Sequence, residues 1–269
     1  MQHFKASDGL TLAYQIDDFT DPWRDADTLI LLHAAMGSTR RLYAWVPTLC
    51  RDYRVVRLDL RGHGQSEIPG EGQLSLERLT QDVFDLMDEL DIEQAHIAGS
   101  SAGGIIAMHA TLEAPTRIKS LGAFAAIPGL KMSAGHTDYN AWISAIRDVG
   151  VREFLSRTIS DRFNVEDVEP GFVDWFLDEA AKNNPELLAR FVTLMSGVDF
   201  ADRIGEIQCP TLMVVPGGDP NQSMEEYEFC RDSIAGSELV VYDGKRHNIT
   251  DSDPERCAED LLRFLKEQL

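Results

Sequence analysis

A serine between two glycines is the first candidate for chemistry in this chain. Gly99, Ser101 and Gly103 follow a short apolar run that begins at Ala95, and a helix-like segment, Ile105 to Glu113, comes after them. This strand–turn–helix context is typical of a nucleophile elbow, in which small residues let strand and helix approach closely. The hydroxyl would lie at a helix N-terminus, whose dipole favours the negative charge that develops during acyl transfer. Because glycine and serine are common, the spacing alone leaves a plain Gly/Ser turn equally open.

Acyl transfer by a serine also requires a base and an acid that orients it. His247 follows the last expected strand, and Asp219 follows the expected strand before it. Since the carboxyl ends of parallel strands meet at one edge of a sheet, we expect both side chains to lie there with Ser101. The order serine, aspartate, histidine is the order expected of such an architecture. Three acids nearer to the histidine are expected in loops and helix caps instead: Asp243, Asp251 and Asp253.

Two backbone N–H groups are expected to stabilise the oxyanion. One belongs to Ala102, directly after the serine, and the other to Ala35, in the loop after the expected strand that ends at His33. Backbone donors leave no signature in the side chains, so position in the chain is the whole basis of this prediction.

The segments around these residues alternate between strands and helices, which predicts a parallel sheet with helices on both faces. An initial hairpin, Phe4 to Ile16, turns at an Asp-Gly pair. The remaining expected strands are Thr28 to His33, Arg54 to Leu60, the run from Ala95, Ile118 to Phe124, Thr211 to Val215 and Glu238 to Tyr242. Besides the segment after the serine, the expected core helices are Leu42 to Cys50, Leu76 to Leu90, Met224 to Ile234 and Pro254 to Leu269.

The alternation stops at Pro128-Gly129, and only amphipathic helical patterns follow until about Phe200. We therefore expect a core domain made of residues 1–130 and 201–269, with a helical cap, residues 131–200, inserted in it. The expected cap helices are Tyr139 to Val149, Val151 to Ile159, Gly171 to Ala181 and Glu186 to Met195.

Composition excludes several classes of partner. The chain has 269 residues, 43% of them hydrophobic, which suffices for one core and a modest insertion. A net charge of −20 argues against nucleic acid or an anionic membrane as partner.

The sequence shows no sign of a membrane segment or a signal peptide. No apolar run approaches the length of a membrane span, and the N-terminus lacks the apolar segment of a signal peptide, so we expect a cytoplasmic protein. No metal cluster or nucleotide fingerprint appears, so no cofactor is expected. The cysteines form neither a zinc motif nor a disulfide framework: Cys50, Cys209, Cys230 and Cys257.

The chain resembles the α/β-hydrolase superfamily over nearly its whole length. The resemblance rests on His33-Ala34, the segment from Asp59 to Ser66, the elbow, Gly217-Gly218-Asp219, and His247. Within the superfamily the chain looks most like small cap-bearing esterases and enol-lactonases. The glycine that normally follows the loop histidine is Ala34 here, and because alanine tolerates positive φ poorly, the oxyanion loop is expected to differ in shape.

The substrate pocket is expected between the sheet edge and the cap. Arg40 and Arg41 follow the oxyanion loop, where they would either meet a substrate carboxylate or begin a solvated helix. The candidate lining residues are Met36, Ile127, Trp142, Trp175, Phe176 and Phe191.

Together these features indicate a serine hydrolase that cleaves a carboxylic ester or lactone through an acyl-enzyme on Ser101. The expected partner is a small-molecule ester or lactone, and a homodimer is compatible with the sequence. Two alternatives stay open: a C–C bond hydrolase with the same residues, and a ligand-binding signalling protein that keeps a slow triad.

Overall fold

One mostly parallel sheet runs through the part of the chain that this computed structural model describes, residues 1–131 and 137–268. Within those residues eight strands lie in the order β1-β2-β4-β3-β5-β6-β7-β8. The β1–β2 hairpin and the β2–β4 pair are antiparallel, and every later pair is parallel. The strands are β1 (Gln2–Lys5), β2 (Thr11–Asp17), β3 (Thr28–Leu32), β4 (Arg54–Leu58), β5 (Ala95–Ser100), β6 (Ile118–Phe124), β7 (Thr211–Pro216) and β8 (Glu238–Tyr242).

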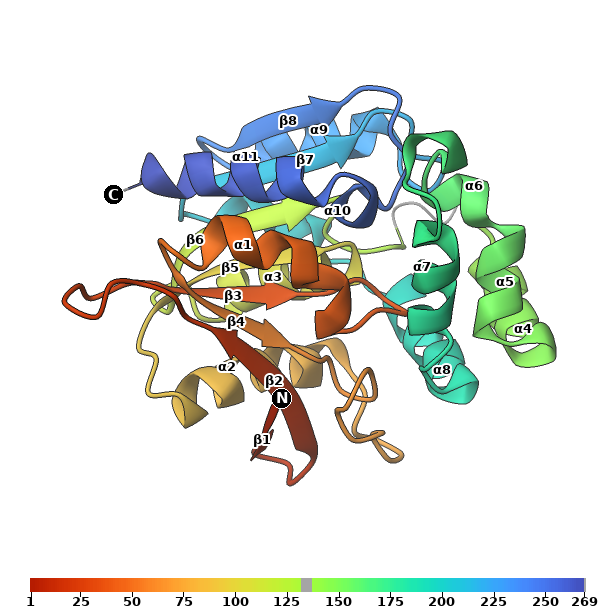
Figure 1. Ribbon diagram of the computed structural model, residues 1–269, viewed down its shortest axis with the longest axis horizontal. Coiled ribbons are helices and arrows are strands. Elements are labelled where there is room, and N and C mark those ends of the chain that lie inside the picture. The colour runs from red at the N-terminus through yellow and green to blue at the C-terminus, as the bar shows by residue number, and fades with distance from the viewer. Residues whose placement is uncertain (132–136, 269) are drawn as a thin grey trace.

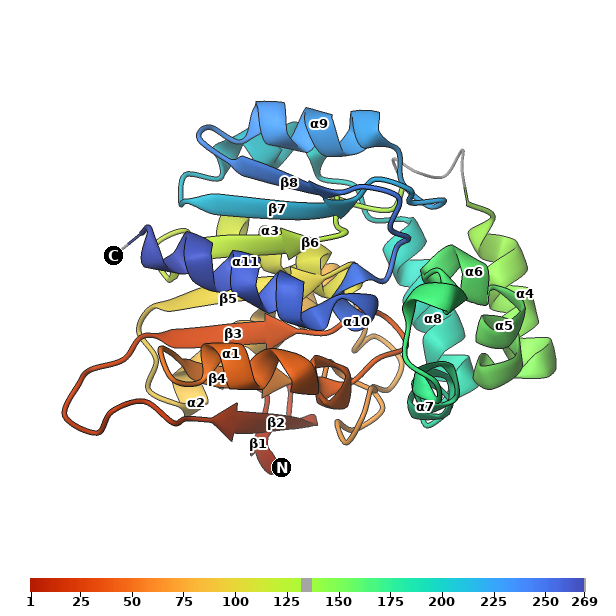
Figure 2. The ribbon, with the colours of Figure 1, turned by 45° about the horizontal axis from the view of Figure 1, so that its top comes forward.

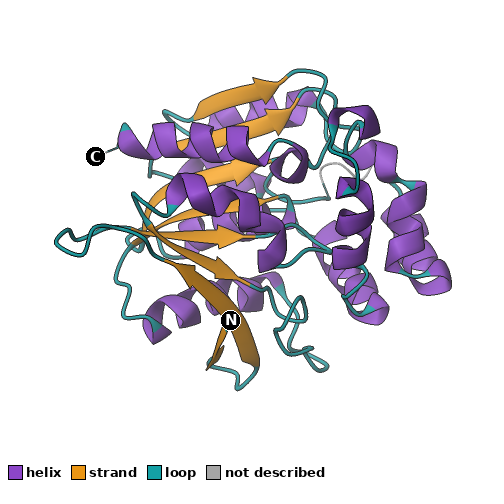
Figure 3. Ribbon diagram, in the orientation of Figure 1, coloured by secondary structure: helices purple, strands orange, loops and turns teal. Residues whose placement is uncertain are grey.

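Helices cover both faces of the sheet, as Figures 1, 2 and 3 show, and the predicted fold class is confirmed. One face carries the 3-10 helix η1 (Thr39–Trp45), α1 (Val46–Leu49), α10 (Ile249–Ser252) and α11 (Pro254–Lys266). The other face carries α2 (Leu76–Glu89), α3 (Ala102–Glu113), the 3-10 helix η3 (Ala201–Glu206) and α9 (Met224–Ser233).

Two-sided burial explains why the central strands are apolar throughout. In β3, Leu29 and Leu31 pack into the cluster on the α11 side, whereas Ile30 and Leu32 pack into the cluster on the α3 side. Successive side chains of a strand point to opposite faces, so a sheet covered on both sides needs an apolar residue at every position.

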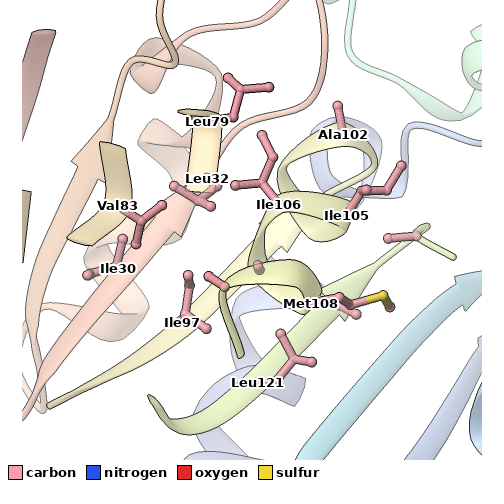
Figure 4. Close-up of a cluster of buried hydrophobic side chains, with 14 of the residues drawn as sticks. Ile30, Leu32, Leu79, Val83, Ile97, Ala102, Ile105, Ile106, Met108 and Leu121 are labelled. Carbon is pink, nitrogen blue, oxygen red and sulfur yellow. The ribbon is translucent and has the colours of Figure 1, made fainter. Parts of the chain in front are cut away.

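Helix α3 is fixed in place because it is buried on all sides. Every residue from Ala102 to Leu112 is buried. In Figure 4, Ile105, Ile106 and Met108 lie among side chains from the sheet, including Ile97. Dense packing of this kind permits little movement of the helix that follows Ser101.

The helices between β6 and β7 stand together beyond the carboxyl ends of the parallel strands, where the arrowheads point in Figure 1. They have their own apolar cluster, which includes Ile146, Phe154, Phe163 and Leu188. These helices lie in the segment for which the sequence predicted an inserted cap. Residues 132–136 of the expected cap, and Leu269 at the end of the last expected helix, lie outside the described residues. The cap helices are α4 (Tyr139–Val149), α5 (Val151–Arg157), α6 (Ile159–Arg162), α7 (Phe172–Ala180) and α8 (Pro185–Ser196), with the 3-10 turn η2 (Val165–Asp167) before α7.

Several boundaries differ from the sequence prediction by a few residues, and two of the differences have a clear physical reason. Helix α3 begins directly after Ser101 rather than at Ile105, because the glycines of the elbow form its first turn. The helix expected from Val151 to Ile159 divides at Thr158, whose hydroxyl donates to the carbonyl oxygen of Phe154 at 3.1 Å. A side chain that bonds to the preceding turn competes with continued helix geometry.

Candidate active site

Ser101 occupies a strained turn between β5 and α3. Its φ of 49° and ψ of −114° lie outside the regions that residues with side chains normally adopt. A Cβ on Gly99 would lie 2.2 Å from the carbonyl oxygen of Gly103, and a Cβ on Gly103 would lie 2.4 Å from that of Leu32. Strand and helix can therefore approach closely only because both flanking residues are glycine.

Gly99→Ala is expected to destabilise the protein by about 1–3 kcal/mol or more, because backbone atoms block the new methyl group and no side chain can rotate away. Urea unfolding followed by circular dichroism measures the change in free energy of unfolding. Gly197→Ala is the matched control, since a Cβ there would meet its nearest neighbour at an ordinary 3.5 Å. Equal stability of the two variants would contradict the close approach at the elbow.

Ser101, His247 and Asp219 form a continuous hydrogen-bonded array. Nδ1 of His247 donates to Oδ2 of Asp219 at 2.8 Å, and the hydroxyl of Ser101 donates to Nε2 of His247 at 2.9 Å. An ionised aspartate accepts only, so it holds the proton of the imidazole on Nδ1 and leaves Nε2 free to accept. This is the geometry in which a serine proton can pass to a histidine.

Asp219 is held ionised by its neighbours although it is fully buried. Burial disfavours the charge, but His247, the N–H of Asn221 at 2.9 Å and the hydroxyl of Tyr227 at 2.7 Å together hold the pKa of the carboxyl below its usual value. Of the other acids considered, Asp251 pairs with Arg41 and Asp253 with Lys245, so neither orients the histidine.

Tyr227 on α9, which the sequence analysis did not single out, donates a hydrogen bond to the carboxylate of Asp219. We expect it to position that carboxylate. Tyr227→Phe removes one hydrogen bond from the Asp219 carboxylate, which should raise the pKa of that carboxyl. We expect kcat to fall about 10-fold, which corresponds to ~1.4 kcal/mol. Tyr242→Phe is the matched control, because the hydroxyl of Tyr242 donates to Asp260 instead, at 2.7 Å. An equal loss of kcat in both variants would show a general packing effect.

Ala35 and Ala102, whose N–H groups are the predicted oxyanion donors, both border the cavity beside Ser101. Neither has a hydrogen-bond acceptor among the described residues. The positive φ of the loop falls on Met36, at 62°, and not on Ala34, so the alanine is accommodated without strain. Ala34 in place of the usual glycine is therefore tolerated, because the positive φ of this loop is adopted by Met36.

His33 fixes the shape of this loop. The N–H of Leu60 donates to Nε2 of His33 at 3.0 Å, so the proton lies on Nδ1, which donates to the carbonyl oxygen of Ala34 at 2.8 Å. Burial lowers the pKa of His33 to about 4, so the ring is neutral at neutral pH. From the cap, the side-chain amide of Asn183 donates to the carbonyl oxygen of Met36 at 3.2 Å.

The segment from Asp59 to Ser66 braces the same loop. The carboxylate of Asp59 accepts from the N–H of Thr39 at 2.6 Å and of Gln65 at 2.9 Å. A Cβ on Gly64 would lie 2.2 Å from that carboxylate, which explains the glycine. This segment therefore supports the site without contributing a reactive group.

A small cavity of about 60 Å³ lies between the array and the cap. Four of the expected lining residues border it: Met36, Trp142, Phe176 and Phe191. The prediction was wrong for two residues, since Ile127 packs in the core beside α3, and Trp175 packs against Tyr43 at a separate surface cleft. Residues that the sequence did not single out also border the cavity, among them Leu155, Arg162, Val192, Met195, Asn221 and Asn248.

The two arginines after the loop are both engaged by acids of the protein. Arg40 is exposed and pairs with Glu179 at 3.0 Å. Arg41 borders the cavity, but its guanidinium makes a buried two-point contact with the carboxylate of Asp251 and lies 4.2 Å from the centre of the Phe176 ring. Nε and Nη2 of Arg41 are therefore committed to Asp251.

Within the described residues no group of three or more His, Cys, Asp or Glu side chains could hold a metal ion. In the same part of the chain, no helix has both the length and the apolar character to span a membrane.

Comparison with known proteins identifies the family. A family model described as the alpha/beta hydrolase fold matches residues 27–254. This chain belongs to the alpha/beta hydrolase family. It is 26% identical over 225 residues to 3-oxoadipate enol-lactonase 1 of Acinetobacter baylyi, with 82% of each chain covered. The crystal structure of a hydrolase from Pseudomonas aeruginosa PA01 has a TM-score of 0.87 and 29% identity, covering 98% of this chain and 97% of that one.

The enol-lactonase from Burkholderia xenovorans LB400 has the same fold, with a TM-score of 0.88 and 21% identity. The match covers 98% of this chain and 100% of that one.

Proposed function

We propose that the protein is a serine hydrolase that cleaves a carboxylic ester or lactone through an acyl-enzyme formed on Ser101. The single observation that carries this proposal is the hydrogen bond of 2.9 Å from the strained, cavity-facing Ser101 to His247, which is itself oriented by buried Asp219. Such a constellation activates a hydroxyl that is otherwise a weak nucleophile.

The reaction proceeds in two halves. Oγ of Ser101 attacks the substrate carbonyl while Nε2 of His247 takes the hydroxyl proton, and the N–H groups of Ala35 and Ala102 stabilise the oxyanion. Collapse of the tetrahedral intermediate breaks the ester bond, and the histidine returns the proton to the leaving alkoxide. A water molecule then attacks the acyl group and gives a proton to His247. As this second tetrahedral intermediate collapses, the bond from the acyl carbon to Oγ breaks, His247 returns the proton to Oγ, and the acid and the free serine are released.

The surroundings of the array support a small substrate. The cavity is small and mostly apolar, and its cap side is formed by Trp142, Phe176 and Phe191. We expect a small lactone to suit this space, because a ring is more compact than an open-chain ester with the same number of atoms. The relationship to 3-oxoadipate enol-lactonase 1 supports the same substrate class.

A panel of short p-nitrophenyl esters and small lactones tests the proposal. We expect sustained turnover of several members, with kcat/KM highest for short acyl groups because the cavity is small. Turnover should be equal with and without dioxygen. Binding without sustained turnover would instead indicate the signalling protein, and turnover of β-diketones in preference to esters would indicate the C–C bond hydrolase.

A further inference from the structure

A second arginine borders the cavity, and it comes from the cap. Arg162 is the last residue of α6 and lines the same cavity as Ser101 and His247. Its carbonyl oxygen accepts a hydrogen bond of 2.8 Å from the N–H of Asn248, the residue after the histidine. Arg162 is therefore attached through its backbone to the loop that carries the proposed base.

The guanidinium of Arg162 is buried without an acidic partner. The residue is only 6% exposed, and no carboxylate in the described part of the chain forms a salt bridge with it. Among the described residues, neither Nε nor Nη2 has a hydrogen-bond partner. The guanidinium instead lies 4.5 Å from the centre of the Trp142 ring and 6.0 Å from that of Phe154. Buried charges are normally paired, so two unpaired donors call for an explanation.

Arg162 differs in this respect from Arg41, which borders the same cavity. The charge of Arg41 is balanced by Asp251, whereas Arg162 borders the cavity without a salt bridge and lies against the ring of Trp142. Burial lowers the pKa of Arg162 to about 10, which leaves the side chain cationic at neutral pH. In a chain of net charge −20, this places a cation without a salt-bridge partner at the border of the cavity.

A neighbouring donor also lacks a partner. The side-chain amide Nδ2 of Asn221 is buried at the cavity without a hydrogen-bond acceptor among the described residues. The backbone N–H of Asn221 meanwhile donates to Asp219. Arg162 and Asn221 thus offer unpaired hydrogen-bond donors at one cavity, and the arginine is charged. A carboxylate is the complementary ligand, because it is negatively charged and only accepts hydrogen bonds.

We propose that Arg162 binds a carboxylate which the ester or lactone substrate carries in addition to the bond that is cleaved. This inference rests on the proposed function and narrows its substrate class. The planar guanidinium presents two parallel N–H groups to a carboxylate, which a lysine cannot do. The ring of Trp142 lies against the guanidinium, and the substrate carboxylate would supply the acidic partner that the protein does not provide.

Equilibrium binding tests the site without any turnover. Glutarate and adipate serve as probes, measured by calorimetry against the wild type, Arg162→Met and Arg157→Gln. We expect Kd for the better probe to be about 10- to 100-fold weaker in Arg162→Met, because a charge-assisted hydrogen-bonded pair is lost. Arg157→Gln is the matched control, since Arg157 lies on the preceding helix, is exposed and pairs with Glu153. Equal Kd values in all three proteins would overturn the proposal.

Steady-state kinetics with matched substrates tests whether Arg162 favours hydrolysis of an ester that carries a carboxylate. Monomethyl glutarate and monomethyl adipate are compared with their half-amides, which have nearly the same shape but no charge. We expect the wild type to prefer the anionic ester by at least about 10-fold in kcat/KM, and Arg162→Met to lose this preference while its kcat/KM for the amide stays near that of the wild type. A loss of equal size for both substrates would overturn the carboxylate role.

The two readouts separate the failure of this inference from that of the proposed function. Turnover of both esters with no preference for charge would reject the carboxylate site and keep the hydrolase. Probe binding that depends on Arg162, without turnover of either ester, would keep the site and reject the hydrolase. Should Arg162→Met fail to fold, Arg162→Lys replaces it. The preference of the wild type for the anionic ester over the half-amide is measured without any variant.

We expect the Tm of Arg162→Met to be no lower than that of the wild type, because an unpaired buried charge is removed.

Discussion

Ser101→Ala is expected to lower kcat for ester hydrolysis by a factor on the order of 10⁶, because the variant has no nucleophile to form the acyl-enzyme. The fold should be retained. The Ser101 side chain makes no capping hydrogen bond to α3, and alanine meets the same backbone strain as serine at this position. Steady-state rates with a short p-nitrophenyl ester, together with Tm, measure both effects.

Ser100→Ala is the control, since its hydroxyl contacts that of Thr250 at 2.7 Å and not the histidine. It should keep activity within about 10-fold of the wild type, a loss on the scale of one buried hydrogen bond. Activity of Ser101→Ala close to that of the wild type would contradict the acyl-enzyme. Oxygen-dependent turnover that survives the substitution would indicate a cofactor-free oxygenase.

Asp219→Asn should lower kcat by a factor on the order of 10⁴. The N–H of Asn221 donates to Oδ1, so the amide oxygen should take that place and the NH₂ should face Nδ1 of His247 in place of Oδ2. An NH₂ group donates and cannot accept the Nδ1 proton, so the imidazole adopts the tautomer that cannot take the serine proton. KM should change little, because Asp219 lies behind the histidine, with its side chain fully buried.

Asp243→Asn is the matched control, because Asp243 lies exposed in the loop between β8 and His247. It should have the activity of the wild type. If Asp219→Asn stays nearly fully active while Asp243→Asn does not, the acid has been wrongly assigned.

The fold was predictable because the strands and helices have clear patterns of different kinds. The apolar runs of β6 and β8 predicted both boundaries of each strand, and the helical spacing of α4 predicted that helix from Tyr139 to Val149. The edge of the sheet then determined which serine, acid and histidine could meet. His247 lies within hydrogen-bond distance of both Ser101 and Asp219, as expected for residues that follow β8, β5 and β7.

Residues whose role depends on the orientation of the cap were not predictable. Trp175 and Phe176 are neighbours on α7 and point in different directions, which no pattern in the sequence reveals. Arg162 ends a short polar helix, and such an arginine is normally solvated. Its burial arises only where α6 meets Trp142 and the loop of His247. Tyr227 resembles any apolar residue on the inner face of a helix until its hydroxyl is placed beside Asp219.

Labelling with a fluorophosphonate, followed by peptide mapping, tests the central claim most directly, because the reagent reacts with an activated serine and stays attached. We predict one label per chain, on Ser101, with loss of ester turnover in proportion to labelling and no label in Ser101→Ala. Full labelling of a different residue, or turnover that persists when Ser101 is fully labelled, would contradict the proposal.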